Sequence, residues 1–80
     1  MNIRILRRPQ VLEAVGYSGS TLHARISERL FPRSVQIGPR AVGWPAHEVS
    51  AINAARIAGK TDDEVRQLVA VLEAKRKRAT

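Results

Sequence analysis

The 80-residue chain contains no cysteine and only two histidines, His23 and His47. A disulfide framework and a thiolate-metal site are therefore excluded, and two distant histidines do not suffice for a zinc site. The sequence has no apolar run near the roughly 20 residues of a membrane-spanning helix, and its start, MNIRILRRPQ, lacks the long apolar core of a signal peptide. We therefore expect a soluble, cytoplasmic protein with no metal or other cofactor and no contact with membranes.

Aromatic and acidic residues are also scarce. The three aromatic residues, Tyr17, Phe31 and Trp44, are few for a protein that holds single-stranded RNA, which is commonly bound by stacking. Fourteen Lys and Arg residues outnumber seven Asp and Glu residues, which gives a formal charge of +7. Such an excess attracts polyanions over a long range. The alternative reading is that the basic residues only keep the protein soluble.

The chemistry of an enzyme is missing as well. The sequence offers no nucleophile with a matched base, no carboxylate pair with a pocket and no glycine-rich loop for phosphates. We therefore expect neither enzymatic activity nor a small-molecule ligand.

Two short helices with a tight turn between them are predicted in the first half of the chain. The first begins near Pro9, which suits a first helical turn, and ends at Gly16. The second extends over about residues 18–30, with Ser18 as N-cap and Leu22, Ile26 and Leu30 along one stripe. This arrangement is a helix-turn-helix pattern, which many helical hairpins share.

A strand pattern follows, at residues 34–44. Apolar residues alternate on both sides of the turn Gly38-Pro39-Arg40-Ala41, as in a β-hairpin. A two-stranded ribbon is marginally stable alone, so we expect its apolar face to lie on the helices, with Trp44 in the core. Residues 1–6 are expected to form a short strand or an extended lead-in.

Two further helices complete the chain. The third begins at Pro45 and ends at Gly59, and the fourth begins with a capping box, Thr61 to Glu64. The fourth helix carries an apolar stripe too short for a firm coiled-coil assignment. It either packs back onto the domain or mediates dimerisation. Its basic end, Lys75-Arg76-Lys77-Arg78, is either a solubilising helix terminus or a second contact to phosphate.

The run LRRPQVLEAVGYSGSTLHARISERLFPRSVQIGPRAVGWPAHEVSAINAARIA resembles the AlpA family of phage and prophage transcriptional regulators. The family is similar to excisionases and to the winged helix-turn-helix of MerR-type regulators. The most specific parts are the opening of the second helix at Ser18, the Phe31-Pro32 corner and the segment 38–44. The sequence departs from the family at Gly19 and at His23-Ala24, which leaves the target sequence open.

The resemblance implies a mainly α fold with a small β-hairpin, that is, a winged helix-turn-helix plus a C-terminal helix. We expect a DNA-binding domain over 1–59 and the C-terminal helix over 60–80. The recognition helix, about 18–30, would enter the major groove, and the wing, about 34–44, would follow the backbone or the minor groove. The implied function is sequence-specific binding of double-stranded DNA by a transcriptional regulator of a phage, prophage or integrated element.

Two alternatives remain open at this stage. One is an excisionase-like architectural factor that sets the direction of recombination, and the other is a protein-interaction adaptor with only nonspecific DNA affinity. The oligomeric state is equally open between a monomer, a homodimer and a cooperative assembly on tandem sites.

Candidate DNA contacts are the basic and polar residues of the second helix, of the wing and of the start of the first helix. They are Ser18, Ser20, Thr21, His23, Arg25, Arg29, Arg33, Gln36, Arg40, Arg7 and Arg8.

Some of these candidates have a competing structural role, and others have none. Arg25 suits a bidentate contact to guanine or a phosphate, or else an ion pair with Glu28. The hydroxyls of the second helix's first turn suit a phosphate, or plain capping. Arg40 has no evident partner at the turn tip, which favours DNA contact. Arg7 and Arg8 precede a helix N-terminus, where cations are unfavourable unless a phosphate lies near.

Overall fold

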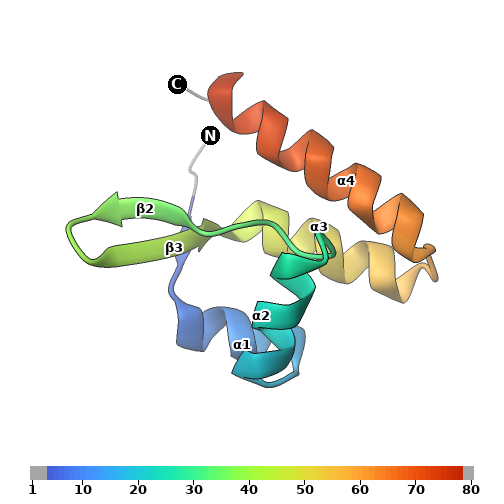
Figure 1. Ribbon diagram of the computed structural model, residues 1–80, viewed down its shortest axis with the longest axis horizontal. Helices are drawn as coiled ribbons and strands as arrows, with labels where there is room; N and C mark the ends of the chain where they lie inside the picture. Colours follow the sequence, from blue (N-terminus) through green and yellow to red (C-terminus); the bar gives the residue numbers. More distant parts are fainter. Residues whose placement is uncertain (1–3, 79–80) are drawn as a thin grey trace.

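The computed structural model describes residues 4–78, which form four α-helices and a small antiparallel sheet (Figure 1). The predicted fold class, a mainly α winged helix-turn-helix with a C-terminal helix, is confirmed. None of the helices within residues 4–78 combines the length and the apolar character needed to cross a membrane.

The helix-turn-helix consists of α1 (Arg8–Val15) and α2 (Gly19–Ser27). Helix α1 carries Pro9 in its first turn and ends at Gly16, whose φ of 78° is left-handed. Glycine adopts this conformation without steric cost, which explains the sharp end of α1. Helix α2 begins at Ser18, whose hydroxyl accepts a hydrogen bond from the Thr21 N–H at 3.3 Å. Both predicted boundaries are therefore correct.

Helix α2 ends at Ser27, three residues earlier than predicted. The N–H of Leu30 donates to the carbonyl of Arg25 at 2.8 Å, and the N–H of Arg29 donates to Ile26 at 3.1 Å. This pair of bonds is a Schellman motif, with Arg29 left-handed at φ 63°. Leu30 therefore reaches the core from the connection after α2 and is not part of its apolar stripe.

The sheet has three strands in the order β1-β3-β2: β1 (Ile5–Leu6), β2 (Val35–Gly38) and β3 (Ala41–Pro45). Both ladders are antiparallel, and β1 pairs Leu6 with Trp44. Of residues 1–6, which were expected to form a short strand or an extended segment, Ile5 and Leu6 form strand β1. Residues 1–3 lie outside the described part. The β2–β3 hairpin projects away from the helices (Figure 1).

The expectation that one apolar face of the hairpin covers the helices is wrong. Gln36 pairs with Val42, and residues opposite each other across a ladder share a face. Val42 and Trp44 therefore face the opposite way from Val35 and Ile37. Trp44 is buried, but Ile37 and Val42 remain 44% and 43% exposed. Only the base of the hairpin is anchored in the core, and its tip is free to meet a partner.

The remaining helices are α3 (Ala46–Ile57) and α4 (Asp62–Lys75), with a 3-10 turn, η1 (Arg76–Arg78), at the end. Helix α4 begins with the predicted capping box: the Glu64 N–H donates to the Thr61 hydroxyl at 3.2 Å, and the Thr61 N–H donates to the Glu64 carboxylate at 2.9 Å. The hydrogen bond from the Thr61 N–H to the carboxylate, helped by the Thr61 hydroxyl, holds the pKa of Glu64 below its ordinary value.

One hydrophobic core unites all of these elements. Every α-helix contributes to it, as do β3 and the connection after α2, through Val11, Leu22, Leu30, Phe31, Trp44, Val49, Ile52, Val65, Val69 and Leu72. Three of these ten residues come from α4. Helix α4 therefore packs back onto the domain, with α3 as its main neighbour, which was the first of the two alternatives predicted for it.

A buried ion pair joins the start of α3 to η1, at the C-terminal end of α4. Glu48, in the first turn of α3, is fully buried, and Arg76 of η1 clasps its carboxylate with two hydrogen bonds of 2.9 and 2.6 Å. The carboxylate raises the pKa of the Arg76 guanidinium. The same guanidinium donates to the carbonyl of Arg33 at 2.7 Å. Arg76 of the basic end thus has a structural role.

We predict that Arg76→Met lowers the free energy of unfolding by about 3 kcal/mol, because it leaves the Glu48 carboxylate buried without a counter-charge. Urea denaturation would measure the loss. The matched control is Lys75→Met, which changes an exposed neighbour and should alter stability by about 0.5 kcal/mol or less. The double variant Glu48→Leu/Arg76→Met should recover most of the loss. An unchanged urea midpoint in Arg76→Met would contradict a structural role for the pair.

Candidate nucleic-acid interface

Helix α2 exposes a stripe of polar and small residues. Ser20, His23, Ala24 and Ser27 are exposed at helical spacing, while Leu22 on the other side is buried; these four residues are called the α2 stripe below. Neither the His23 nor the Ser27 side chain makes a hydrogen bond within residues 4–78. A helix face with such short side chains lets a large flat partner approach the backbone closely, as a groove of DNA would require.

Hydroxyl groups at the start of α2 bond to one another. The Ser18 hydroxyl lies 3.2 Å from the Ser20 hydroxyl and donates to the Thr21 hydroxyl at 3.1 Å. Ser18 and Ser20 are exposed. The predicted capping role is therefore present. Since the single proton of the Ser18 hydroxyl points to Thr21, the exposed Ser18 and Ser20 hydroxyls must rotate to donate to an oxygen acceptor such as a phosphate.

The guanidinium of Arg8 lies directly against this helix start. A Cβ atom added at Gly19 would collide with Arg8 Nη2 and would lie 3.1 Å from its Cζ. Gly19 thus provides the space that Arg8 occupies. A cation at a helix N-terminus opposes the helix dipole. The predicted mismatch concerns the start of α1, where Arg7 is the N-cap and Arg8 the first residue, and the Arg8 guanidinium adds a second one at the start of α2. Arg7 is exposed as well, and its N–H donates to Gln10 at 2.9 Å.

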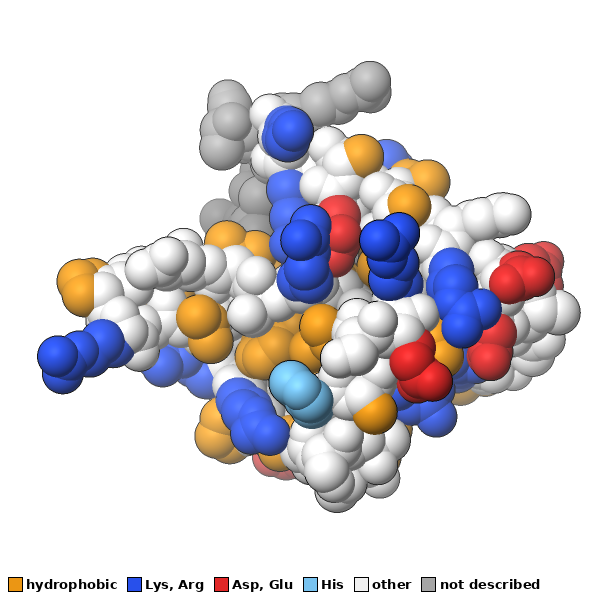
Figure 2. All heavy atoms as spheres, in the orientation of Figure 1, with side chains coloured by type: hydrophobic (Ala, Val, Ile, Leu, Met, Phe, Trp, Pro, Cys, Tyr) orange, Lys and Arg blue, Asp and Glu red, His pale blue; other side chains and the backbone are white. Residues whose placement is uncertain are grey.

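The hairpin presents one arginine at its tip. Arg40 is exposed and left-handed, with φ 59°, in a two-residue turn whose other member is Pro39. It makes no ion pair or hydrogen bond within the described residues. Figure 2 shows a basic side chain extending beyond the end of the hairpin. Gln36 is exposed on β2, on the face that it shares with Val42.

The Arg25 side chain does not project freely from α2, because it packs against Tyr17. Its guanidinium lies over the ring of Tyr17, 5.0 Å from the centroid, and its Nε atom is buried without a hydrogen-bond partner. It does not pair with Glu28, as the alternative reading proposed. Partial burial raises the pKa of Tyr17, against the opposite influence of Arg25 and Arg56. Arg25 therefore stays at the flank of the α2 stripe.

Three more arginines surround a hollow between the end of α2 and α4. Arg29 and Arg33 follow α2, and Arg66 comes from α4. Sequence reasoning selected the first two but missed Arg66, because its spacing from Asp63 is that of an ordinary helix-surface ion pair.

Acidic residues gather at the far end of the molecule. Figure 2 shows most of the visible red side chains on the side opposite the hairpin, where Asp62, Asp63 and Glu64 form the first turn of α4. A hydrogen bond from Arg56 holds the pKa of Asp62 below its ordinary value. The first turn of α4 is therefore less favourable to a polyanion than the hairpin tip and the start of α2, although Arg66 offsets the charge of Asp63 at the edge of this turn.

Metal ions have no evident place in this arrangement. Across the described residues, no three His, Cys, Asp or Glu side chains come together in a way that could hold an ion.

Comparison with known proteins places the chain in a family. The model of the prophage CP4-57 regulatory protein (AlpA) family matches residues 4–56. ORF88, an uncharacterized protein of Enterobacteria phage P4, is 42% identical over 57 residues, which are 71% of this chain and 65% of that protein. The match thus spans slightly less than two thirds of the relative. No solved structure gives a significant match. Since the family model covers more than half of the chain, the chain belongs to the AlpA family of prophage regulatory proteins.

Proposed function

We propose that the protein is a sequence-specific regulator that binds double-stranded DNA. The α2 stripe enters the major groove, and the hairpin, as a wing, follows the adjacent backbone or minor groove. Ser18, Ser20, Arg7 and Arg8 hold phosphates beside the groove. Base contacts come from the α2 stripe and its flanks, where His23 and Arg25 offer hydrogen-bond donors.

The observation that carries this proposal is the pairing of an exposed α2 stripe with an unpaired arginine at the tip of a projecting hairpin. Arg40 adopts a backbone conformation that glycine or asparagine fills more cheaply in a hairpin turn. An arginine in this place costs stability, and its side chain makes no hydrogen bond or ion pair within residues 4–78. Strained residues of this kind concentrate where a protein meets its ligands.

Enrichment of random duplexes by the purified protein, followed by sequencing, tests the proposal. A defined motif whose binding falls steeply with salt is the expected result. Binding of all duplexes alike, lost at physiological salt, would contradict sequence-specific recognition and favour an adaptor that binds proteins. A bend assay on the selected duplex then separates a regulator from an excisionase-like factor, because only the latter role requires bent DNA.

We predict that Arg40→Gly stabilises the fold and weakens binding to every duplex by a similar factor. Glycine removes the steric cost of the left-handed backbone at the turn, about 1 kcal/mol. Loss of one phosphate contact should reduce the salt slope, which is the slope of log K against log salt concentration, by about 0.9 in magnitude. Thermal denaturation and anisotropy titrations at several salt concentrations would measure the two effects. Unchanged affinity would remove the wing tip from the interface.

We predict that Gly19→Ala weakens DNA binding without unfolding the protein. The new Cβ displaces only the end of the flexible Arg8 side chain, and alanine is a better helix former than glycine. The double variant Gly19→Ala/Arg8→Ala should bind like Arg8→Ala alone, since both changes act through one guanidinium. Additive losses in the double variant would show that Gly19 does not act through Arg8.

A further inference from the structure

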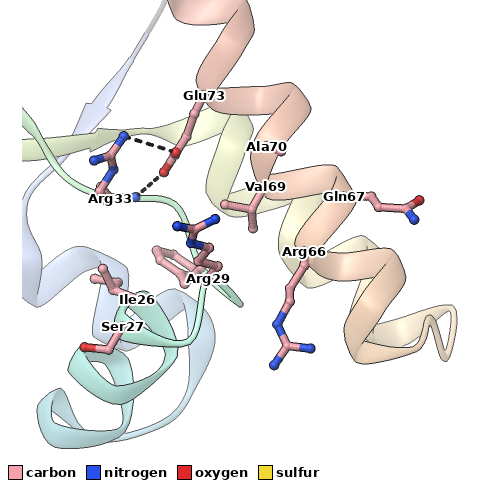
Figure 3. Close-up of a pocket in the computed structure, with 10 residues that line it drawn as sticks. Ile26, Ser27, Arg29, Arg33, Arg66, Gln67, Val69, Ala70 and Glu73 are labelled. Atoms are coloured by element: carbon pink, nitrogen blue, oxygen red, sulfur yellow. Dashed lines mark hydrogen bonds and ion pairs between the residues drawn. The ribbon is translucent and has the colours of Figure 1, made fainter.

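The hollow at the end of α2 is a cleft with arginines on its rim and apolar side chains at its base. It has a volume of about 650 Å³ and lies between α2 and α4. Figure 3 shows Arg29 between Arg33 on one side and Arg66 on the other. Ile26, Phe31 and Val69 line its base, and Glu73 is the only carboxylate among the lining residues. The cleft therefore carries an excess of positive charge.

Ser27 connects this cleft to the proposed DNA-binding surface. It is the last residue of the α2 stripe and it also lines the cleft. A partner that lies along the α2 stripe would therefore continue past Ser27 to the arginine rim.

Arg29 has a strained left-handed backbone at the end of α2, whereas glycine occupies the equivalent position at the end of α3. Both α2 and α3 end in a Schellman motif, with left-handed Arg29 in one and left-handed Gly59 in the other. Arg29 makes no hydrogen bond or ion pair through its side chain within residues 4–78. The fold would be better served by glycine at this position. The Arg29 side chain is therefore available to a partner other than the described residues.

The two other rim arginines are already held in place. Arg66 donates its Nε–H to the carbonyl of Glu28 at 3.0 Å and contacts Asp63, whose side chain is 89% exposed, at 3.2 Å. The backbone N–H of Arg33 donates to Glu73 at 2.9 Å, and its guanidinium lies 3.5 Å from the same carboxylate. These contacts hold the Arg33 and Arg66 side chains in place, and they leave the charge of Arg29 without a counter-ion. An anion at the rim would therefore find Arg29 unpaired and two further arginines already oriented.

We infer that the cleft binds a phosphate of the DNA backbone beside the groove that α2 occupies, with Arg29 as the main contact and Arg66 of α4 as the second. This inference rests on the proposed function. It extends the interface beyond the helix-turn-helix and the wing, and it makes α4 part of the DNA-binding surface.

Titration of a labelled duplex with the wild type, Arg29→Gly and Arg66→Gln at several salt concentrations tests the inference. Arg29→Gly should raise Tm by about 4–8 °C, as relief of a left-handed arginine would. It should also bind about tenfold more weakly and lose about 0.9 from the salt slope. Arg66→Gln, which does not change the strained turn, should show a loss of slope in the same direction.

Lys60→Ala is the matched control, because it removes one exposed charge at the α3–α4 turn, outside the cleft. An equal loss of affinity in Lys60→Ala would mean that only net charge matters, and would overturn the inference. Unchanged affinity and slope in a stabilised Arg29→Gly would overturn it as well, while the proposed function would stand. If the wild type itself bound no duplex, that result would contradict the proposed function and, with it, the inference that depends on it.

Discussion

The ion pair between Glu48 and Arg76 is the interaction on which the arrangement of this small protein depends. An unpaired carboxylate in the core would cost several kcal/mol, and an 80-residue chain has little stability to lose. Glu48 is therefore compatible with the fold only when η1 lies against the start of α3. The pair fixes where α4 ends, so that Val65, Val69 and Leu72 meet the core in one register.

The same contacts position the joint between α2 and the wing. Arg76 and Glu73 hold the backbone of Arg33 from one side, and the indole N–H of Trp44 donates to the carbonyl of Pro32 at 2.9 Å from the other. This short segment leads from the end of α2 into β2. The angle between α2 and the hairpin is thus set by residues from α4 and β3, outside the helix-turn-helix itself. Helix α4 is a structural part of the domain.

Sequence reasoning succeeded where a feature depends on residues close together in the chain. Gly16, Ser18 and the Thr61–Glu64 capping box each mark a helix boundary by local chemistry. It failed where a partner lies far along the chain. The pairing of Glu48 with Arg76 spans 28 positions, and a basic terminal run reads equally well as a solubilising end. The early end of α2 was also hidden, because an arginine at the left-handed position of a Schellman motif is statistically unexpected.

In the candidate interface too, sequence reasoning found features set by neighbouring residues and missed contacts between residues distant in the chain. The sequence identified the basic and polar residues of α2 and the wing, but it could not tell that Arg25 lies against Tyr17 or that Gly19 makes room for Arg8. Within the described residues, the non-glycine residues with left-handed backbones are Arg29 and Arg40. Both are exposed and neither has a structural partner. Selection for stability alone would place glycine at both positions. Under the proposed function, the two left-handed arginines, one on the hairpin and one at the end of α2, would both contact the repeated negative charges of a DNA backbone.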